Sequence, residues 1–107
     1  MDLIRADLHL HSTASDGTWL PQELVAAAKQ ANLGAIAVTD HESVANVEQT
    51  EEYALEAGMQ FLRGVEISTT KGETSFHVLG YGIDIANRRL LELLDHNEYL
   101  LAKKDED

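Results

Sequence analysis

Two histidines separated by a single residue, His9 and His11, are the first residues in this sequence whose types and spacing suggest chemistry. Residues two apart in an extended strand point to the same face, so this spacing lets two imidazoles hold one metal ion. The same spacing also arises by chance on an edge strand. From the pair alone, a metal site and a chance pairing are equally good interpretations.

The balance changes when other imidazole and carboxylate side chains are placed on the predicted elements. Four of the five histidines fall on predicted strands or strand ends, and a carboxylate accompanies each of the first three strands. A structural histidine in the core would have to be invoked four separate times, which disfavours that interpretation. The candidate metal ligands are therefore His9, His11, Asp16, His41, Glu66 and His77, with Asp40 beside them.

His96 is the exception among the histidines. It lies in the polar stretch Asp95-His96-Asn97-Glu98 of a predicted helix, with no partner from a strand. We expect a solvated helix residue there rather than a ligand.

The elements that must position these residues alternate between strand and helix, which indicates an α/β fold with a largely parallel sheet. Strands are predicted at 3–10, 35–38, 61–67 and 75–81. The first helix is expected to begin at Pro21 and to end at a Gly34 C-cap, and Ser43 is expected to cap the second, which ends before Gly58.

The last helix is predicted from about residue 86 to 101, and residues 103–107 are expected to form a charged, frayed end. Its apolar face is predicted to comprise Leu90, Leu93, Leu94 and Leu101. In a parallel α/β sheet the loops beyond the carboxyl ends of the strands meet on one side, where sites are built. The candidate ligands fall at those ends.

Composition excludes several other classes of function. The 107 residues carry 19 acids against 8 bases, a net charge of −11, and the scattered bases form no groove for nucleic acid. The absence of cysteine rules out disulfides and thiolate metal sites. No signal peptide or membrane span is evident, so a soluble cytoplasmic protein is expected. The acidity fits either simple solubility or carboxylates that face bound cations.

Imidazole and carboxylate ligands suit zinc, manganese or iron, and the ligand types do not choose among them. A carboxylate such as Glu66 can bridge two ions, and clustered ions activate water and clamp a phosphoryl oxygen, which is the chemistry of phosphoester hydrolysis. No phosphate-binding Gly-rich loop and no nucleophile elbow is present. Ser12, Thr13 and Ser15 have the chemistry to bind a phosphate, although turn roles are favoured for them.

Five motifs then resemble, in order, those of the polymerase and histidinol phosphatase (PHP) family. They are Asp7-Leu8-His9-Leu10-His11-Ser12, Ser15-Asp16-Gly17, Thr39-Asp40-His41, Gly64-Val65-Glu66 and Phe76-His77-Val78-Leu79-Gly80-Tyr81. The match covers nearly the whole chain and looks most like the stand-alone phosphoesterases that act on nucleotides and short oligonucleotides.

The resemblance implies a distorted (β/α)7 barrel with up to three divalent ions at the carboxyl ends of its strands. By motif, His9 and His11 would hold one ion, and Glu66 would bridge it to a second ion held by His77. Asp16 and His41 would hold the third. Asp40 is expected to orient a ligand rather than to bind metal.

The family's later ligands, in a His-Pro motif and near the C-terminus, have no counterpart here, since Pro21 is the only proline. Residues 1–107 are therefore expected to be the N-terminal part of a single PHP domain, an incomplete barrel with open sheet edges that is inactive alone. An arginine-bearing segment typical of the nucleotide-active branch is also missing after the last predicted helix.

Two alternatives remain open beside a metal-dependent phosphoesterase acting on a nucleotide, a nucleoside bisphosphate or an oligonucleotide end. One is an amidohydrolase-type enzyme that cleaves a C–N bond, since that superfamily also begins with His-x-His on a first strand. The other is a metal-binding domain without catalysis, a structural or regulatory partner whose open sheet edge pairs with a second chain, either a copy of itself or the missing half.

Overall fold

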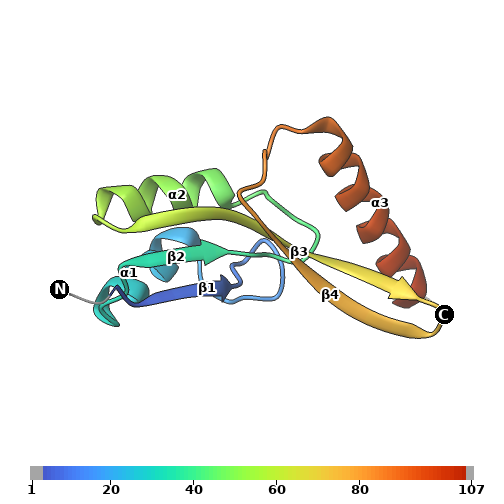
Figure 1. Ribbon diagram of the computed structural model, residues 1–107, viewed down its shortest axis with the longest axis horizontal. Helices are drawn as coiled ribbons and strands as arrows, with labels where there is room; N and C mark the ends of the chain where they lie inside the picture. Colours follow the sequence, from blue (N-terminus) through green and yellow to red (C-terminus); the bar gives the residue numbers. More distant parts are fainter. Residues whose placement is uncertain (1–3, 106–107) are drawn as a thin grey trace.

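The computed structural model describes residues 4–105 as a four-stranded sheet with three helices (Figure 1). The elements are β1 (Ala6–Leu10), α1 (Pro21–Gln30), β2 (Ala35–Val38), α2 (Val47–Glu56), β3 (Gln60–Lys71), β4 (Thr74–Tyr81) and α3 (Arg88–Asp105). The strands lie in the order β1-β2-β3-β4. β1, β2 and β3 are parallel, whereas β4 runs antiparallel to β3. The predicted α/β class with a mainly parallel sheet, which matches part of a PHP-type barrel, is confirmed.

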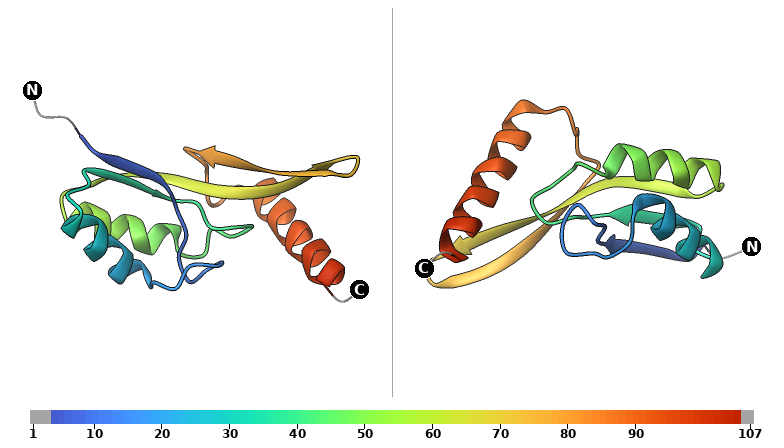
Figure 2. Two further views of the ribbon diagram at one scale, coloured as in Figure 1. Left: turned by 90° about the horizontal axis from the view of Figure 1, so that it is seen from below. Right: turned by 180° about the vertical axis from the view of Figure 1, so that it is seen from behind.

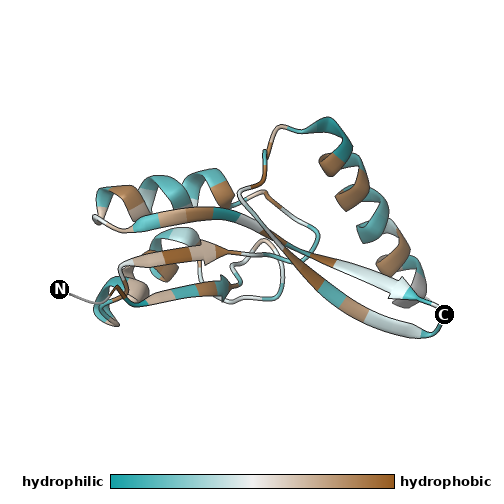
Figure 3. Ribbon diagram, in the orientation of Figure 1, coloured by the Kyte–Doolittle hydropathy of each residue, from teal (hydrophilic) through white to brown (hydrophobic). Residues whose placement is uncertain are grey.

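The core lies between the parallel strands and two helices that cover one face of them (Figure 2). β2 sits between two neighbours and is coloured as hydrophobic along its length in Figure 3. Ile36 and Val38 on this strand are fully buried. Ala37, which points to the other face of the strand, is fully buried as well, and a strand covered on both faces needs such a continuous apolar run. The helices and loops complete the cluster with Leu24, Val25, Ala28, Ala54 and Met59.

Beyond Glu66, which still bridges to His41 at the exit of β2, β3 leaves this core and pairs with β4 alone, forming a long two-stranded ribbon. Its other edge is closed by side chains instead of a strand. The Ser68 amide donates to Glu42 Oε1 at 2.7 Å, and the Ser68 carbonyl accepts from Asn97 Nδ2 of α3 at 3.2 Å. These bonds satisfy backbone groups that a free edge would leave unpaired. α3 is thereby fixed beside the ribbon.

Several predicted element boundaries were wrong. Gly34 does not cap α1: the helix ends at Gln30, and Asn32 takes the left-handed conformation with φ of 61°. The Gly34 amide instead donates to the Arg5 carbonyl at 2.7 Å, at the entry of β2. Asn tolerates positive φ better than most residues, so it can take the place that a C-terminal glycine usually fills.

Ser43 does not cap α2 either. Its hydroxyl accepts from the Ala45 amide at 3.2 Å, which forms a local turn, and the helix begins at Val47 after Asn46. The predicted third strand was too short, since β3 continues to Lys71, and the predicted start of the first strand at Leu3 lies outside the described residues.

The apolar face of α3 also differs from the predicted one. Leu94 is buried, but Leu93 and Leu101 are 44% and 41% exposed. The helix continues to Asp105, so the expected frayed end is helical up to that residue, and residues 106–107 lie outside the described range. Within residues 4–105, no helix combines the length and the apolar character that crossing a membrane requires.

Candidate metal centre

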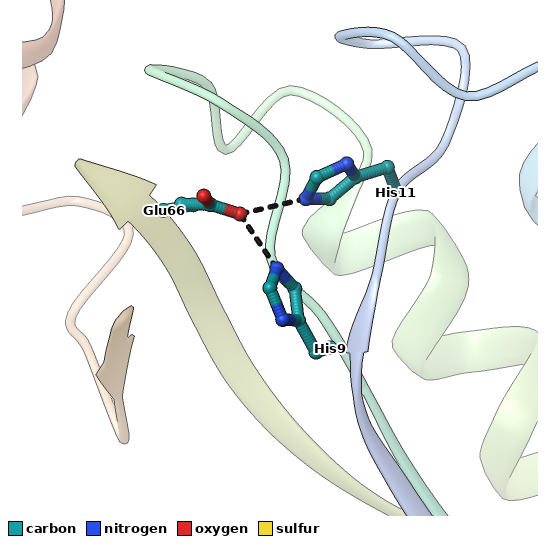
Figure 4. Close-up of side chains that lie close together, drawn as sticks. All are labelled: His9, His11 and Glu66. Atoms are coloured by element: carbon teal, nitrogen blue, oxygen red, sulfur yellow. Dashed lines mark hydrogen bonds and ion pairs between the residues drawn. The ribbon is translucent and has the colours of Figure 1, made fainter. Parts of the chain in front are cut away.

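Glu66 on β3 is the centre of the candidate site. Glu66 is only 3% exposed, and its two carboxylate oxygens face four imidazoles. Oε1 lies 2.7 Å from His9 Nε2 and 2.8 Å from His11 Nε2 (Figure 4). Oε2 lies 2.7 Å from His77 Nδ1 and 3.7 Å from His41 Nδ1. Side chains from all four strands or their exits therefore converge on one carboxylate.

The fold explains why these residues meet. His9 lies on β1 and His11 directly after it, and both rings reach the same Glu66 oxygen, as expected for residues two apart in an extended segment. His41 follows β2 and forms an isolated parallel bridge to Glu66, so the exit of β2 runs beside β3. His77 faces Ser68 across the antiparallel ribbon, two residues beyond Glu66 on the same face of the sheet.

Asp16 joins the cluster from the loop that follows β1. Its Oδ1 lies 2.6 Å from His11 Nδ1, and its Oδ2 lies 3.4 Å from His41 Nε2. Gly17 next to it packs directly against the His11 carbonyl, where an added Cβ would overlap the backbone. Only glycine allows the loop to approach this closely, and that approach returns Asp16 to the imidazoles.

All six predicted ligands thus fall into three overlapping triads, with ligand atoms within 4.8 Å of one another in each triad. The triads are His9, His11 and Glu66; His11, Asp16 and His41; and His41, Glu66 and His77. Their shared members place three candidate metal positions side by side. His96, by contrast, is exposed on α3 and belongs to none of these triads.

The chemistry of the donor set fits divalent metal ions. Both ring nitrogens of His11 face carboxylate oxygens, at 2.6 Å from Asp16 and 2.8 Å from Glu66. A neutral imidazole carries one N–H, so one of its nitrogens must present a lone pair to an oxygen lone pair. A cation between the groups relieves that repulsion. Nitrogen and oxygen donors of this kind suit zinc, manganese or iron.

The electrostatic environment holds both carboxyl groups of the centre in the ionised form. Burial raises the pKa of Glu66, but hydrogen bonds from His9 and His11 and the nearby His41 outweigh burial and lower it to about 2. For Asp16, burial likewise raises the pKa, but the nearby His11 and His41 outweigh burial and lower the pKa below its usual value. Ionised carboxylates are the form that binds metal.

Asp40 is buried and contacts none of the imidazoles through its side chain. Its Oδ1 accepts from the Ser12 amide at 2.6 Å and from the Ser15 hydroxyl at 2.8 Å, and its Oδ2 accepts from the Ser12 hydroxyl at 2.6 Å. Asp40 therefore clamps the loop between His11 and Asp16. The hydroxyls of Ser12 and Ser15 serve this loop, in line with the favoured turn roles.

Three residues beside the centre were missed in the sequence. Asn46 donates to the Ser12 hydroxyl at 3.0 Å and so supports the clamped loop. Glu42 is 5% exposed with φ of 52°, and it receives hydrogen bonds from the Ser68 amide and from Asn97. An acidic residue directly after a candidate ligand was a weak signal for Glu42. Asn97 gave none, because a single amide on a polar helix face is ordinary.

A parallel α/β sheet with histidines and carboxylates gathered at its strand ends is typical of metal-dependent hydrolases. Comparison with known families is consistent with that class. The model of the PHP domain matches residues 7–106, and the chain belongs to the PHP domain family.

Curated relatives carry phosphoesterase names. A 5′-3′ exoribonuclease of Haemophilus influenzae is 37% identical over 98 residues, covering 92% of this chain and 36% of that protein. A 3′,5′-nucleoside bisphosphate phosphatase of Chromobacterium violaceum is 37% identical over 84 residues, which cover 78% of this chain and 30% of that protein. The chain thus spans about a third of the length of the curated relatives it matches.

Solved structures show the same fold. A Chromobacterium violaceum protein described as an amidohydrolase, with bound sulfate and no metal, superposes with a TM-score of 0.84 at 35% identity, covering 86% of this chain and 32% of that one. A Bifidobacterium adolescentis protein described as a metal-dependent phosphoesterase gives a TM-score of 0.82 at 29% identity, and the match covers 89% of this chain and 33% of that one.

Proposed function

We propose that this chain carries part of the metal centre of a phosphoesterase that hydrolyses a small phosphorylated substrate. The observation that carries the proposal is the convergence of four imidazoles on the buried carboxylate of Glu66. The Asp16 carboxylate lies beside two of these imidazoles, those of His11 and His41. Membership in the PHP domain family and the names of the relatives support the reaction class.

Each triad would hold one divalent ion. His9 and His11 would bind the first, and His77 the second, with Glu66 between them through its two oxygens. Asp16 and His41 would bind the third. Divalent ions bound there would supply activation of water and neutralisation of charge on a phosphoryl group. Because the relatives are about three times longer, we propose that residues 1–107 form the N-terminal part of one PHP domain whose remaining residues add ligands.

The chain's own residues would shape this chemistry in two ways. Asp40 would hold the loop that presents His11 and Asp16, so that their donor atoms keep their separation. Glu66, kept ionised by its histidine neighbours, would remain ready to bind cations at all physiological pH values. The cluster lies at the carboxyl ends of the parallel strands, which is where a substrate enters such folds.

For the substrate we propose a nucleotide, a nucleoside bisphosphate or an oligonucleotide end. The support is the names of two relatives, an exoribonuclease and a nucleoside bisphosphate phosphatase. The similar structure with bound sulfate supports a site for a tetrahedral anion, although its description as an amidohydrolase favours a C–N hydrolase as a second candidate.

The test begins with the metal content of the purified chain, measured by inductively coupled plasma mass spectrometry after loosely bound ions are removed. We expect one or more equivalents of zinc, manganese or iron per chain, and loss of them in Glu66→Gln. Release of inorganic phosphate from a nucleoside bisphosphate, and release of nucleoside monophosphates from a 5′-phosphorylated oligonucleotide, are then measured with the complete gene product loaded with manganese. Metal binding without hydrolysis of either phosphate ester would contradict the proposal, and hydrolysis of a dihydropyrimidine-type amide instead would favour the C–N hydrolase.

A further inference from the structure

The strand that carries the first candidate ligand is irregular. Asp7 of β1 pairs with Ile36 of β2. Leu10 then pairs with Val38, so β1 uses one residue more than β2 between these two pairs. An extra residue of this kind is a β-bulge, which interrupts the ladder and re-aims the side chains that follow it. The bulge falls at His9, immediately beside the metal centre.

The bulge decides which face of the sheet His9 and His11 occupy. Leu10 packs against the core that the helices cover, and the residues on either side of it point to the opposite face, where Glu66 lies. Because side chains alternate along a strand, a regular β1 with Asp7 in its observed pairing would turn both histidines toward the helices. The extra residue therefore delivers both imidazoles to the carboxylate (Figure 4).

A tyrosine from the far strand of the sheet bonds to this bulge. Tyr81 of β4 donates through its hydroxyl to the Leu8 carbonyl at 2.5 Å. It lies opposite Gly64, two residues before Glu66 on β3, so its side chain shares the face that carries the metal centre. β4 and β1 are the two ends of the sheet, three strand intervals of about 4.8 Å apart if the sheet were flat. The bond therefore requires a strongly curled sheet, with Tyr81 spanning its concave face.

Both polar groups of the Leu8–His9 peptide are held by side chains. Its carbonyl accepts from Tyr81, and its amide, on His9, donates to Asp7 Oδ1 at 3.1 Å. A peptide unit is planar, so holding both groups fixes the rotation of the whole plane. That rotation sets the direction in which the His9 side chain leaves the backbone. Two hydrogen bonds, one from β4 and one within β1, thus orient a ligand whose Nε2 lies 2.7 Å from Glu66 Oε1.

We propose that Tyr81 is a positioning residue for the metal centre. Its hydroxyl holds the Leu8–His9 peptide and so keeps the His9 imidazole directed at Glu66 and at the ion that they would share. The inference rests on the proposed metal centre and deepens it, because Tyr81 acts through His9 and need not touch metal or substrate. The hydroxyl, rather than the ring, carries this role, since the Leu8 carbonyl needs a donor.

Tyr81→Phe tests the hydroxyl alone, because it keeps the ring. Competition with a chromogenic chelator measures the apparent zinc dissociation constant of the chain. Loss of a group that orients a ligand should weaken zinc binding about tenfold. Tyr99 is 60% exposed on α3, so Tyr99→Phe is the matched control and should bind zinc as the unmodified chain does. Equal affinities in Tyr81→Phe and Tyr99→Phe would overturn the proposal.

A second measurement separates positioning of His9 from a general loss of structure. In a chain that carries His9→Ala, Tyr81→Phe should not weaken zinc binding further, because the ligand that Tyr81 orients is gone. In a chain that carries His77→Ala, the tenfold loss should persist. An equal further loss in both backgrounds would overturn the positioning role, since a general structural effect does not depend on which ligand has been removed.

The partner bond on the same peptide provides an independent check. Asp7→Ala removes the acceptor of the His9 amide, whereas Asp7→Asn keeps an oxygen in its place. We expect Asp7→Ala to bind zinc about tenfold more weakly and Asp7→Asn to bind it nearly as tightly as the unmodified chain. This pair decides the matter if Tyr81→Phe does not fold. Equal affinities in the two Asp7 variants would then overturn the proposal, because the orientation of the peptide would not control the site.

The outcomes also separate this inference from the proposed function. If the unmodified chain binds zinc but the complete gene product hydrolyses no phosphate ester, the proposed reaction fails while the role of Tyr81 stands on the zinc affinities. If the unmodified chain binds no zinc, the metal centre and this inference fail together. If phosphate esters are hydrolysed and Tyr81→Phe binds zinc as tightly as Tyr99→Phe does, the inference alone is refuted.

Discussion

The β1–β3 part of the sheet and the β3–β4 ribbon belong to one continuous sheet but bury their side chains very differently. Ile36 and Val38 of β2 are fully buried beneath α1 and α2. Phe76 and Val78 of β4 are 44% and 49% exposed, because α3 lies beside one edge of the ribbon. The first region is held by an apolar core, and the second is held largely by hydrogen bonds.

The candidate metal centre lies where these two regions meet. The first region presents His9, His11 and His41, together with Asp16 from a loop, while β3 and β4 present Glu66 and His77. A metal ion at the junction would therefore join a well-packed region to a sparsely packed one. Metal binding at this site should contribute more to the order of the ribbon than to that of the core.

The largest effect we expect is on metal binding in Glu66→Gln. The substitution keeps the shape of the side chain but removes the charge that four imidazoles face, so metal affinity should fall on the order of 100-fold or more. Competition with a chromogenic chelator measures the affinity. Glu73→Gln in the exposed turn of the ribbon is the matched control and should bind as the unmodified chain does. Equal affinities in both variants would show that Glu66 is not a ligand.

A smaller effect is expected in the first region from Asp40→Asn. The buried carboxylate accepts three hydrogen bonds, and an amide would replace one accepting oxygen by an NH2 group that faces a donor. We expect a loss of about 3 kcal/mol in the free energy of unfolding, measured by urea denaturation. Ser15→Ala removes one of the three donors and should cost about 1 kcal/mol. Hydrogen exchange should rise in residues 12–16 and remain unchanged in the ribbon; a uniform rise would contradict the local role.

A valine-to-alanine substitution in each region tests directly whether the two regions differ in packing. Val38→Ala empties space in the closed core and should lower the free energy of unfolding by about 2 kcal/mol. Val78→Ala on the exposed face of the ribbon should lower it by about 0.5 kcal/mol. Thermal and urea unfolding of both variants provide the measurement. Equal losses would mean that the ribbon is packed as tightly as the core in solution.

A pH-dependent effect should appear in acid, in the metal-free chain. The pKa of folded Glu66 is about 2, below its usual value of 4.5, so its contribution to stability is present above pH 4.5 and is lost as the pH falls from 4.5 toward 2. The urea midpoint of the unmodified chain should therefore decline over this range more than that of Glu66→Gln. Partial exposure of the surrounding histidines limits the size of the effect. Parallel declines in the two chains would contradict it.

Much of this arrangement could be predicted from the sequence, because it depends on local patterns. The apolar run of β2 and the polar residues at the strand ends placed all six candidate ligands on one side of the sheet. The helix ends were less predictable. Asn32 took the role expected of Gly34, whereas α2 begins after Asn46 without any side-chain cap, so the role expected of Ser43 is not filled. Several residue types satisfy the same terminal geometry, and the local sequence does not rank them.

The sequence by itself determined the donor atoms, their order along the chain and the strand ends that carry them, because residue chemistry and strand periodicity are local properties. Only the tertiary structure decided that one oxygen of Glu66 meets both His9 and His11, and that Asp40 fixes the loop between His11 and Asp16 through three hydrogen bonds. These features depend on the register between strands and on how the loop after β1 packs. Both are set by contacts between residues far apart in the chain, which no local pattern encodes.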